Sequence, residues 1–215
     1  MTFPSHQGFV APLWRRCPGR FDLVALCVGA ALPDLVDGLI GSCRGHFGQG
    51  IGHSLLGIVV LGIPLGVLVR HLVCRAACRL TPAAGNGFLA YAWNRGVAAL
   101  AESLKQPKPR NGWRICVTSL AVGAFVHLLF DLVSHGHFPW LIPWVPKIAI
   151  YPDWWYDVWL RLPLPWKPEG RKIGPHATIW ILLSLWGMWL LLAPAWRTWR
   201  TGLPRESNST GKRDT

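Results

Sequence analysis

Twenty consecutive residues near the C-terminus, Ala177 to Trp196, carry no charged side chain. An α-helix rises about 1.5 Å per residue, so this stretch would be about 30 Å long, the thickness of the hydrocarbon core of a bilayer. It therefore predicts a transmembrane helix. Within a membrane every backbone polar group must be hydrogen-bonded inside the protein, which leaves helices and closed barrels as the available folds. We expect an all-α membrane protein.

Three further apolar stretches predict additional membrane helices. They are residues 54–69 with an extension to 74, residues 115–133, and the shorter residues 23–33. Residues 6–14 predict a short half-helix that precedes a basic turn at residues 15–20. Only 15% of the residues are charged and 51% are hydrophobic, whereas about 25% charge is typical of soluble domains. We expect a helical bundle of four to five membrane helices, forming a single membrane-embedded domain over residues 1–196.

The excess of basic residues predicts the orientation of this bundle. Lys and Arg number 22 against 10 Asp and Glu, and they are frequent in residues 75–114 and after Trp196. Basic loops of membrane proteins remain in the cytoplasm, so we expect a cytoplasmic loop at 75–114 and a disordered cytoplasmic tail at 197–215. Nucleic acid is not an expected partner, because the charges of the basic loop are spread among Pro, Gly and Ala residues.

Residues 136–175 are rich in proline and tryptophan. The tryptophans of this segment are Trp140, Trp144, Trp154, Trp155, Trp159 and Trp166. Because proline interrupts both helices and strands, we expect an irregular segment. Tryptophan is enriched at membrane–water interfaces, so this segment is interpreted as an interfacial cap.

Histidines and membrane-depth carboxylates collect at one end of the predicted helices. His6 begins the half-helix, Asp34 ends the second helix, and His53 begins the next one. His127 and Asp131 lie in the second half of residues 115–133, which ascend to the same side. Ionisable groups are costly in lipid, so each is expected to face a protein-lined or wet site.

The spacing of these residues indicates a metal centre. His127 and Asp131 are four residues apart, which places both on one helix face with Cβ atoms about 5–6 Å apart. With His6, Asp34 and His53 they form an imidazole and carboxylate set suited to Zn²⁺ or Mn²⁺. The alternative is a buried His–Asp hydrogen bond that only joins two helices.

Four short blocks of sequence resemble a known bacterial group. The blocks are Ser5-His6, Gly29-Ala30-Ala31-Leu32-Pro33-Asp34, His53-Ser54-Leu55-Leu56-Gly57 and His127-x-x-x-Asp131-x-x-Ser134-His135. Together they resemble the membrane-bound metal-dependent hydrolases, and within that group a branch of unknown function with an N-terminal Ser-His-Pro motif. The resemblance implies a multi-helix protein of the inner membrane whose metal ligands are His6, Asp34, His53, His127 and Asp131. Gly48 stands where the wider group often has a histidine, so the resemblance gives no support for a second ion.

The leading hypothesis is a metal-dependent hydrolase at the extracytoplasmic interface of the bacterial inner membrane. A site at the level of the headgroups, below an aromatic cap, favours a lipid or a lipid-linked ester as substrate. Asp37 and His135 are the candidates for general base or acid, since each can lie one shell beyond the ligands. The alternative is a non-catalytic membrane protein, either a scaffold with a basic cytoplasmic loop or an ion or proton conductor. The sequence predicts no oligomeric state.

Overall fold

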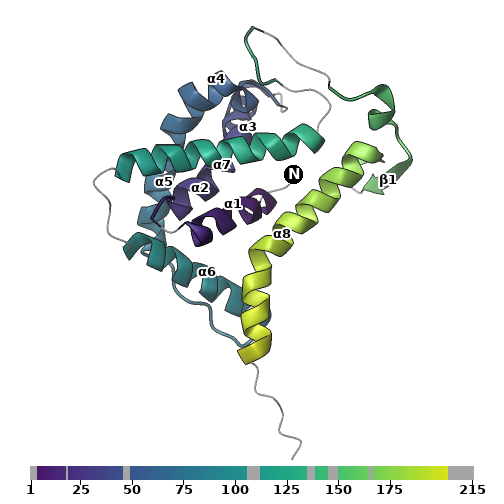
Figure 1. Ribbon diagram of the computed structural model, residues 1–215. Coiled ribbons are helices and arrows are strands. Elements are labelled where there is room, and N and C mark those ends of the chain that lie inside the picture. Colours follow the sequence, from purple (N-terminus) through teal and green to yellow (C-terminus); the bar gives the residue numbers. More distant parts are fainter. Residues whose placement is uncertain are drawn as a thin grey trace, which may run out of the picture.

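The chain forms a bundle of helices with a small β-hairpin at one end (Figure 1). The computed structural model describes residues 4–17, 19–45, 49–105, 112–134, 139–144, 150–164 and 167–202. The elements are α1 (Ser5–Arg16), α2 (Leu23–Gly29), α3 (Leu32–Arg44), the 3₁₀-helix η1 (Ile51–His53), α4 (Leu55–Gly57), the π-helix η2 (Ile58–Gly62), α5 (Ile63–Ala77), α6 (Phe88–Lys105), α7 (Gly112–Ser134), the 3₁₀-helix η3 (Asp153–Tyr156), β1 (Leu160–Leu164), β2 (Lys167–Ile173) and α8 (Pro175–Gly202). The mostly helical architecture confirms the fold class expected from the sequence.

Three helices are long and apolar enough to cross a membrane. They span Leu55–Ala77, Gly112–Leu132 and Pro175–Thr201, and the pair α2–α3, bent by 50°, forms a fourth candidate span. Many of their large apolar side chains point outward, including Val59, Leu68, Phe125, Leu182 and Trp189. Such surfaces are compatible with lipid rather than water. The chain is therefore an integral membrane protein.

Glycines allow α2 and α7 to pack backbone against backbone. A Cβ atom on Gly29 would lie 2.3 Å from the carbonyl oxygen of Leu120, and one on Gly123 would lie 2.4 Å from that of Leu26. Small residues at such crossings are the common means of close helix approach in membranes. The crossing brings the end of α2 next to the second half of α7, where His127 lies.

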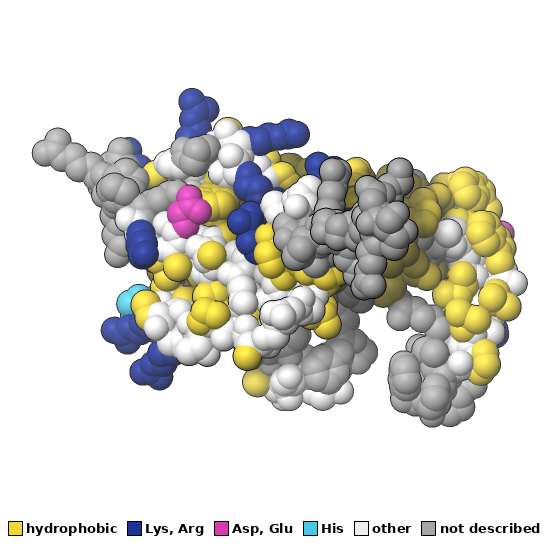
Figure 2. All heavy atoms as spheres, turned by 90° about the horizontal axis from the view of Figure 1, so that it is seen from below, with side chains coloured by type: hydrophobic (Ala, Val, Ile, Leu, Met, Phe, Trp, Pro, Cys, Tyr) yellow, Lys and Arg dark blue, Asp and Glu magenta, His cyan; other side chains and the backbone are white. Residues whose placement is uncertain are grey.

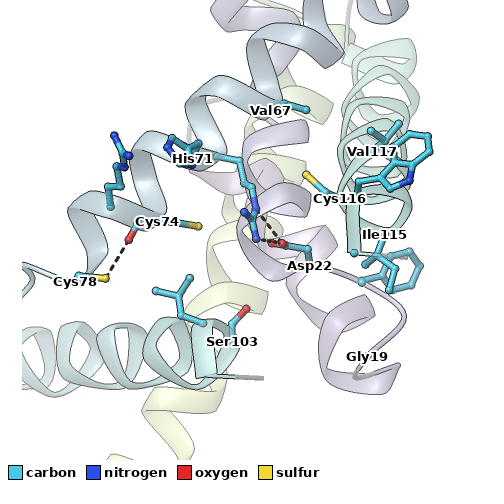
Figure 3. Close-up of a pocket in the computed structure, with 16 residues that line it drawn as sticks. Gly19, Asp22, Val67, His71, Cys74, Cys78, Ser103, Ile115, Cys116 and Val117 are labelled. Carbon is cyan, nitrogen blue, oxygen red and sulfur yellow. Dashed lines mark hydrogen bonds and ion pairs between the residues drawn. The ribbon is translucent and has the colours of Figure 1, made fainter. Parts of the chain in front are cut away.

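Arg70 of α5 and Asp22, which precedes α2, form an ion pair beside a pocket (Figure 3). Arg70 Nε donates to Asp22 Oδ2 at 3.0 Å, and Asp22 Oδ1 accepts the backbone N–H of Ala25 at 2.9 Å, which caps α2. The backbone N–H of Asp22 also donates to Ser119 Oγ of α7. These bonds join three helices beside a pocket of about 850 Å³.

The basic segment 75–114 is not a loop throughout, because α6 occupies residues 88–105 of it. This helix packs against α8, where Phe88 makes ring contacts with Trp196 and Trp199. These apolar contacts stabilise α6 within the segment that its basic residues had indicated to be a loop. Figure 2 views the molecule from below Figure 1, and Lys and Arg side chains gather over part of this face.

The segment predicted to be an irregular cap contains the antiparallel hairpin β1–β2. Leu160 pairs with Ile173 and Leu162 with Arg171, and the register shifts between Leu162 and Leu164. The expectation of no strand was wrong, because this two-stranded sheet tolerates Pro163 at its irregularity. At the other end of α8 the helix continues to Gly202, so the predicted domain boundary at Trp196 falls inside it.

Candidate metal centre

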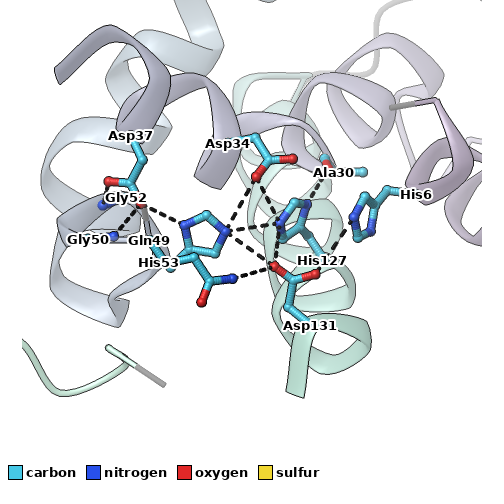
Figure 4. Close-up of polar contacts among 10 residues, drawn as sticks. All are labelled: His6, Ala30, Asp34, Asp37, Gln49, Gly50, Gly52, His53, His127 and Asp131. Carbon is cyan, nitrogen blue, oxygen red and sulfur yellow. Dashed lines mark hydrogen bonds and ion pairs between the residues drawn. The ribbon is translucent and has the colours of Figure 1, made fainter. Parts of the chain in front are cut away.

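Five side chains from four elements meet at one end of the bundle (Figure 4). His6 comes from the first turn of α1, Asp34 from that of α3, His53 from η1, and His127 and Asp131 from the last turns of α7. Four of the residues are buried, with exposed fractions between 0 and 3%. The side chain of Asp34 is 53% exposed at the edge of the group, and its carboxylate points toward His53 and His127 (Figure 4). The convergence expected from the sequence is present.

Three ligand atoms form a nearly equilateral triangle. His53 Nε2 lies 3.3 Å from His127 Nε2 and 3.3 Å from Asp131 Oδ2, and His127 Nε2 lies 3.2 Å from Asp131 Oδ2. Asp34 Oδ1 lies beside the triangle, 3.5 Å from His53 Nε2 and 3.7 Å from His127 Nε2. No thiol belongs to this set among the described residues.

Hydrogen bonds fix the direction of both imidazole lone pairs. His127 Nδ1 lies 2.8 Å from the carbonyl oxygen of Ala30, which can only accept, so Nδ1 carries the proton. His53 Nδ1 lies 2.7 Å from Asp37 Oδ2 and donates to that carboxylate in the same way. With Nδ1 protonated in each ring, the Nε2 atoms of His53 and His127 point toward each other and can bind a proton or a metal ion. Such outer hydrogen bonds are typical of histidines that bind metal.

The donor set fits a divalent cation. Two imidazole lone pairs and a carboxylate oxygen that face one another repel unless a proton on one ring or a bound cation lies between them. Bonds of about 2.0–2.1 Å in a tetrahedral site place neighbouring ligand atoms about 3.3 Å apart, which equals the three edges of the triangle. The five residues therefore include groups that could hold a metal ion.

The electrostatics of His53 show that the surrounding carboxylates favour positive charge, carried either by a proton or by a metal ion. Burial lowers the pKa of the His53 imidazole, but hydrogen bonds to Asp131, Asp34 and Asp37 outweigh this effect and raise that pKa to about 11. The carboxylates thus attract positive charge to His53 Nε2. His6 behaves in the opposite way, because burial and the neighbouring His127 lower its pKa to about 3.

Asp37 holds His53 from outside the triangle. Its Oδ2 accepts the backbone N–H of Gly50 at 2.7 Å as well as His53 Nδ1, and its Oδ1 accepts the backbone N–H of Gly52 at 2.7 Å. A Cβ atom on Gly52 would lie 2.6 Å from the carbonyl oxygen of Pro33, so glycine is required for this approach. The structure gives Asp37 an orienting position, and its assignment as a general base or acid stays a prediction.

Gln49 is a member of the site that the sequence reasoning missed. Its Nε2 donates to Asp131 Oδ2 at 3.0 Å and holds that carboxylate in the triangle. The signal available was a polar side chain between Gly48 and Gly50, four residues before His53. His135, the second catalytic candidate, lies outside the described residues.

The comparisons with known proteins define the family. A family model described as a domain of unknown function, DUF4184, matches residues 1–161 of the 215. No curated protein and no solved structure matches the chain. The resemblance to a family of unknown function is therefore confirmed, whereas the hydrolase activity stays a prediction. Because the match covers well over half of its length, the chain belongs to the DUF4184 family.

Proposed function

We propose that this chain is a membrane-bound, metal-dependent hydrolase that acts at the extracytoplasmic interface on a lipid or a lipid-linked ester. The observation that carries the proposal is the pair of imidazole nitrogens, His53 Nε2 and His127 Nε2, that face each other at 3.3 Å beside Asp131. A hydrogen bond that merely joined two helices would not need two histidines with outer partners on their Nδ1 atoms. Zn²⁺ or Mn²⁺ suits this nitrogen and oxygen donor set.

The ligands would be His53, His127 and Asp131, and Asp34 lies beside them. When bound, such an ion lowers the pKa of a coordinated water to about 7 or polarises a phosphoryl or acyl oxygen. Ala30 and Asp37 hold the two rings in their reactive tautomers, and Gln49 holds the carboxylate of Asp131. This preorganisation keeps the ligand atoms in place without a rearrangement during the reaction.

The exposure of Asp34 supports an open side on the centre. The other four members are almost fully buried, so a substrate would approach past Asp34, whose side chain is 53% exposed. Catalytic metal sites keep one such position free of protein ligands, whereas structural sites are closed.

The surroundings of the centre favour an amphiphilic substrate. Leu55 and Leu129, close in sequence to His53 and His127, are exposed apolar residues on membrane spans. An acyl chain could lie along this surface while its headgroup reaches the carboxylates. The basic residues gather at the opposite end of the spans, which favours a cytoplasmic location for that end and an extracytoplasmic one for the centre.

Metal analysis combined with a lipid assay tests the proposal. Detergent-purified protein should contain stoichiometric Zn²⁺ or Mn²⁺, and Asp131→Ala should lose it. In proteoliposomes the wild-type chain should release phosphate or fatty acid from a panel of phosphatidic acid and phospholipid esters, with activity lost to a chelator and restored by the metal. His71→Ala is the matched control, because this exposed histidine lies on α5 and outside the cluster.

Two results would refute the proposal. Wild-type protein without stoichiometric metal would remove the centre. Protein that binds the metal but hydrolyses no ester of the panel would favour the non-catalytic alternative.

A further inference from the structure

His6 is a buried histidine whose ring nitrogens have no hydrogen-bond partner among the described residues. It is 1% exposed, and its ring stacks on that of His127 at a centroid distance of 3.9 Å. A buried polar atom without a partner costs about 1–3 kcal/mol, and a bound ion or water is a usual explanation. The ring lies on the side of the cluster away from His53, where His6 Nε2 is 3.9 Å from Asp131 Oδ1 (Figure 4).

The carboxylate of Asp131 presents its two oxygens to different partners. Oδ2 lies 3.2 and 3.3 Å from His127 and His53, whereas Oδ1 faces His6. A carboxylate shared in this way can hold one cation with each oxygen. Two-metal hydrolytic sites use such shared ligands to place ions about 3.5–4 Å apart.

His127 cannot serve two ions. The potential ligand groups are His6, Asp34 and His127, and His53, His127 and Asp131, so His127 belongs to both. Its Nδ1 donates to Ala30, which leaves the lone pair of Nε2 for one ion only. If the first ion takes His127, the groups on the other side that could hold a second ion are His6, Asp131 through Oδ1, and Asp34.

We propose that the centre holds two divalent cations, the second bound by His6, Asp131 Oδ1 and Asp34. The inference rests on the proposed function, since it extends the same centre. With three protein ligands, one of them half-exposed, this second site has the open positions. It therefore binds the anionic oxygen of the substrate, which favours phosphate esters over acyl esters because a phosphate offers oxygens to both ions.

Metal stoichiometry tests the second site. Chelator-stripped protein in detergent is titrated with Mn²⁺ by calorimetry, and its bound metal is counted by elemental analysis. We expect two ions for the wild type and for His71→Ala, and one for His6→Phe, which keeps a ring stacked on His127 but removes both nitrogens. The electron paramagnetic resonance spectrum of the wild type should show two exchange-coupled Mn²⁺ ions, and that of His6→Phe the six-line signal of a single ion.

The outcomes separate the two proposals. One ion in the wild type, with an uncoupled spectrum, overturns the second site and leaves the first in place. Two ions in both the wild type and a folded His6→Phe overturn the role of His6. No bound ion in the wild type refutes the proposed function and this inference together. The wild-type spectrum decides the number of ions even if His6→Phe does not fold.

Discussion

Replacing Asp37 with asparagine tests whether this residue orients His53. The carboxylate accepts three hydrogen bonds at 2.7 Å, two on Oδ2 and one on Oδ1. An asparagine keeps one oxygen, and the least costly arrangement turns its NH₂ group toward Gly52. Gly52 then loses its acceptor, and His53 Nδ1 donates to a neutral oxygen instead of a charged one.

The magnitude follows from the change in that bond. Hydrogen bonds to charged acceptors contribute about 1.5–3 kcal/mol, and neutral ones about 0.5–1.5 kcal/mol. A loss of about 1.4 kcal/mol in the orientation of His53 corresponds to roughly tenfold weaker metal binding. Loss of an outer partner of a metal-bound histidine typically costs about 10–100-fold, so Asp37→Asn should fall in that range.

The assay is a competition of the purified protein with a chelator of known affinity for Zn²⁺. Asp153→Asn is the matched control, because this carboxylate is exposed on η3 and should leave affinity unchanged. The melting temperature of each variant in detergent checks folding. An Asp37→Asn affinity within twofold of the wild type would show that the Asp37–His53 bond does not support metal binding.

Three other predictions concern packing, proton linkage and topology. Gly29→Ala should lower the free energy of unfolding by about 3 kcal/mol in thermal unfolding, because its Cβ would meet a backbone carbonyl of α7. Gly38→Ala is the control and should not destabilise the protein, because open space surrounds Gly38. Equal stabilities of the two variants would contradict the close crossing of α2 and α7. Metal binding at pH 8 should release about one proton, because the pKa of His53 is raised to about 11 and the ring is protonated at pH 8. Metal affinity should therefore increase as pH increases toward about 11. Calorimetry in buffers of different ionisation enthalpy measures the proton release, and its absence would refute this linkage. Two variants that each keep a single cysteine, Cys43 or Cys78, test the topology, because both cysteines are exposed and we expect them on opposite sides of the membrane. In intact cells an impermeant thiol reagent should label the Cys43 variant but not the Cys78 variant. The reverse labelling would show the opposite orientation.

Much of the fold was predictable because membrane helices follow from local sequence. The uncharged stretch 177–196 lies within α8, and residues 115–133 lie within α7. Length and hydropathy suffice here, since a helix satisfies its own backbone hydrogen bonds. The helix α6 was missed because contacts with a distant segment stabilise it, as between Phe88 and Trp196. The hairpin β1–β2 was missed because the prolines of its segment indicated irregular structure.

The sequence by itself indicated the five His and Asp side chains of the candidate centre, but not Gln49. His127 and Asp131 follow from helical spacing, and His6, Asp34 and His53 from the ends of helices that return to the same side of a bilayer. Because ionisable groups are costly in lipid, the grouping of these residues at one site can be inferred from the sequence alone.

Only the tertiary structure decided the direction of each ligand atom. The contact of His127 Nδ1 with Ala30 depends on the crossing of α2 and α7, and the bond between His53 and Asp37 depends on the packing of η1 against α3. The two oxygens of Asp131 face different histidines, Oδ1 toward His6 and Oδ2 toward His53 and His127, because α1, η1 and α7 meet there. Ring orientation and tautomer are set by hydrogen bonds between segments distant in sequence, and spacing along one helix carries no information about them.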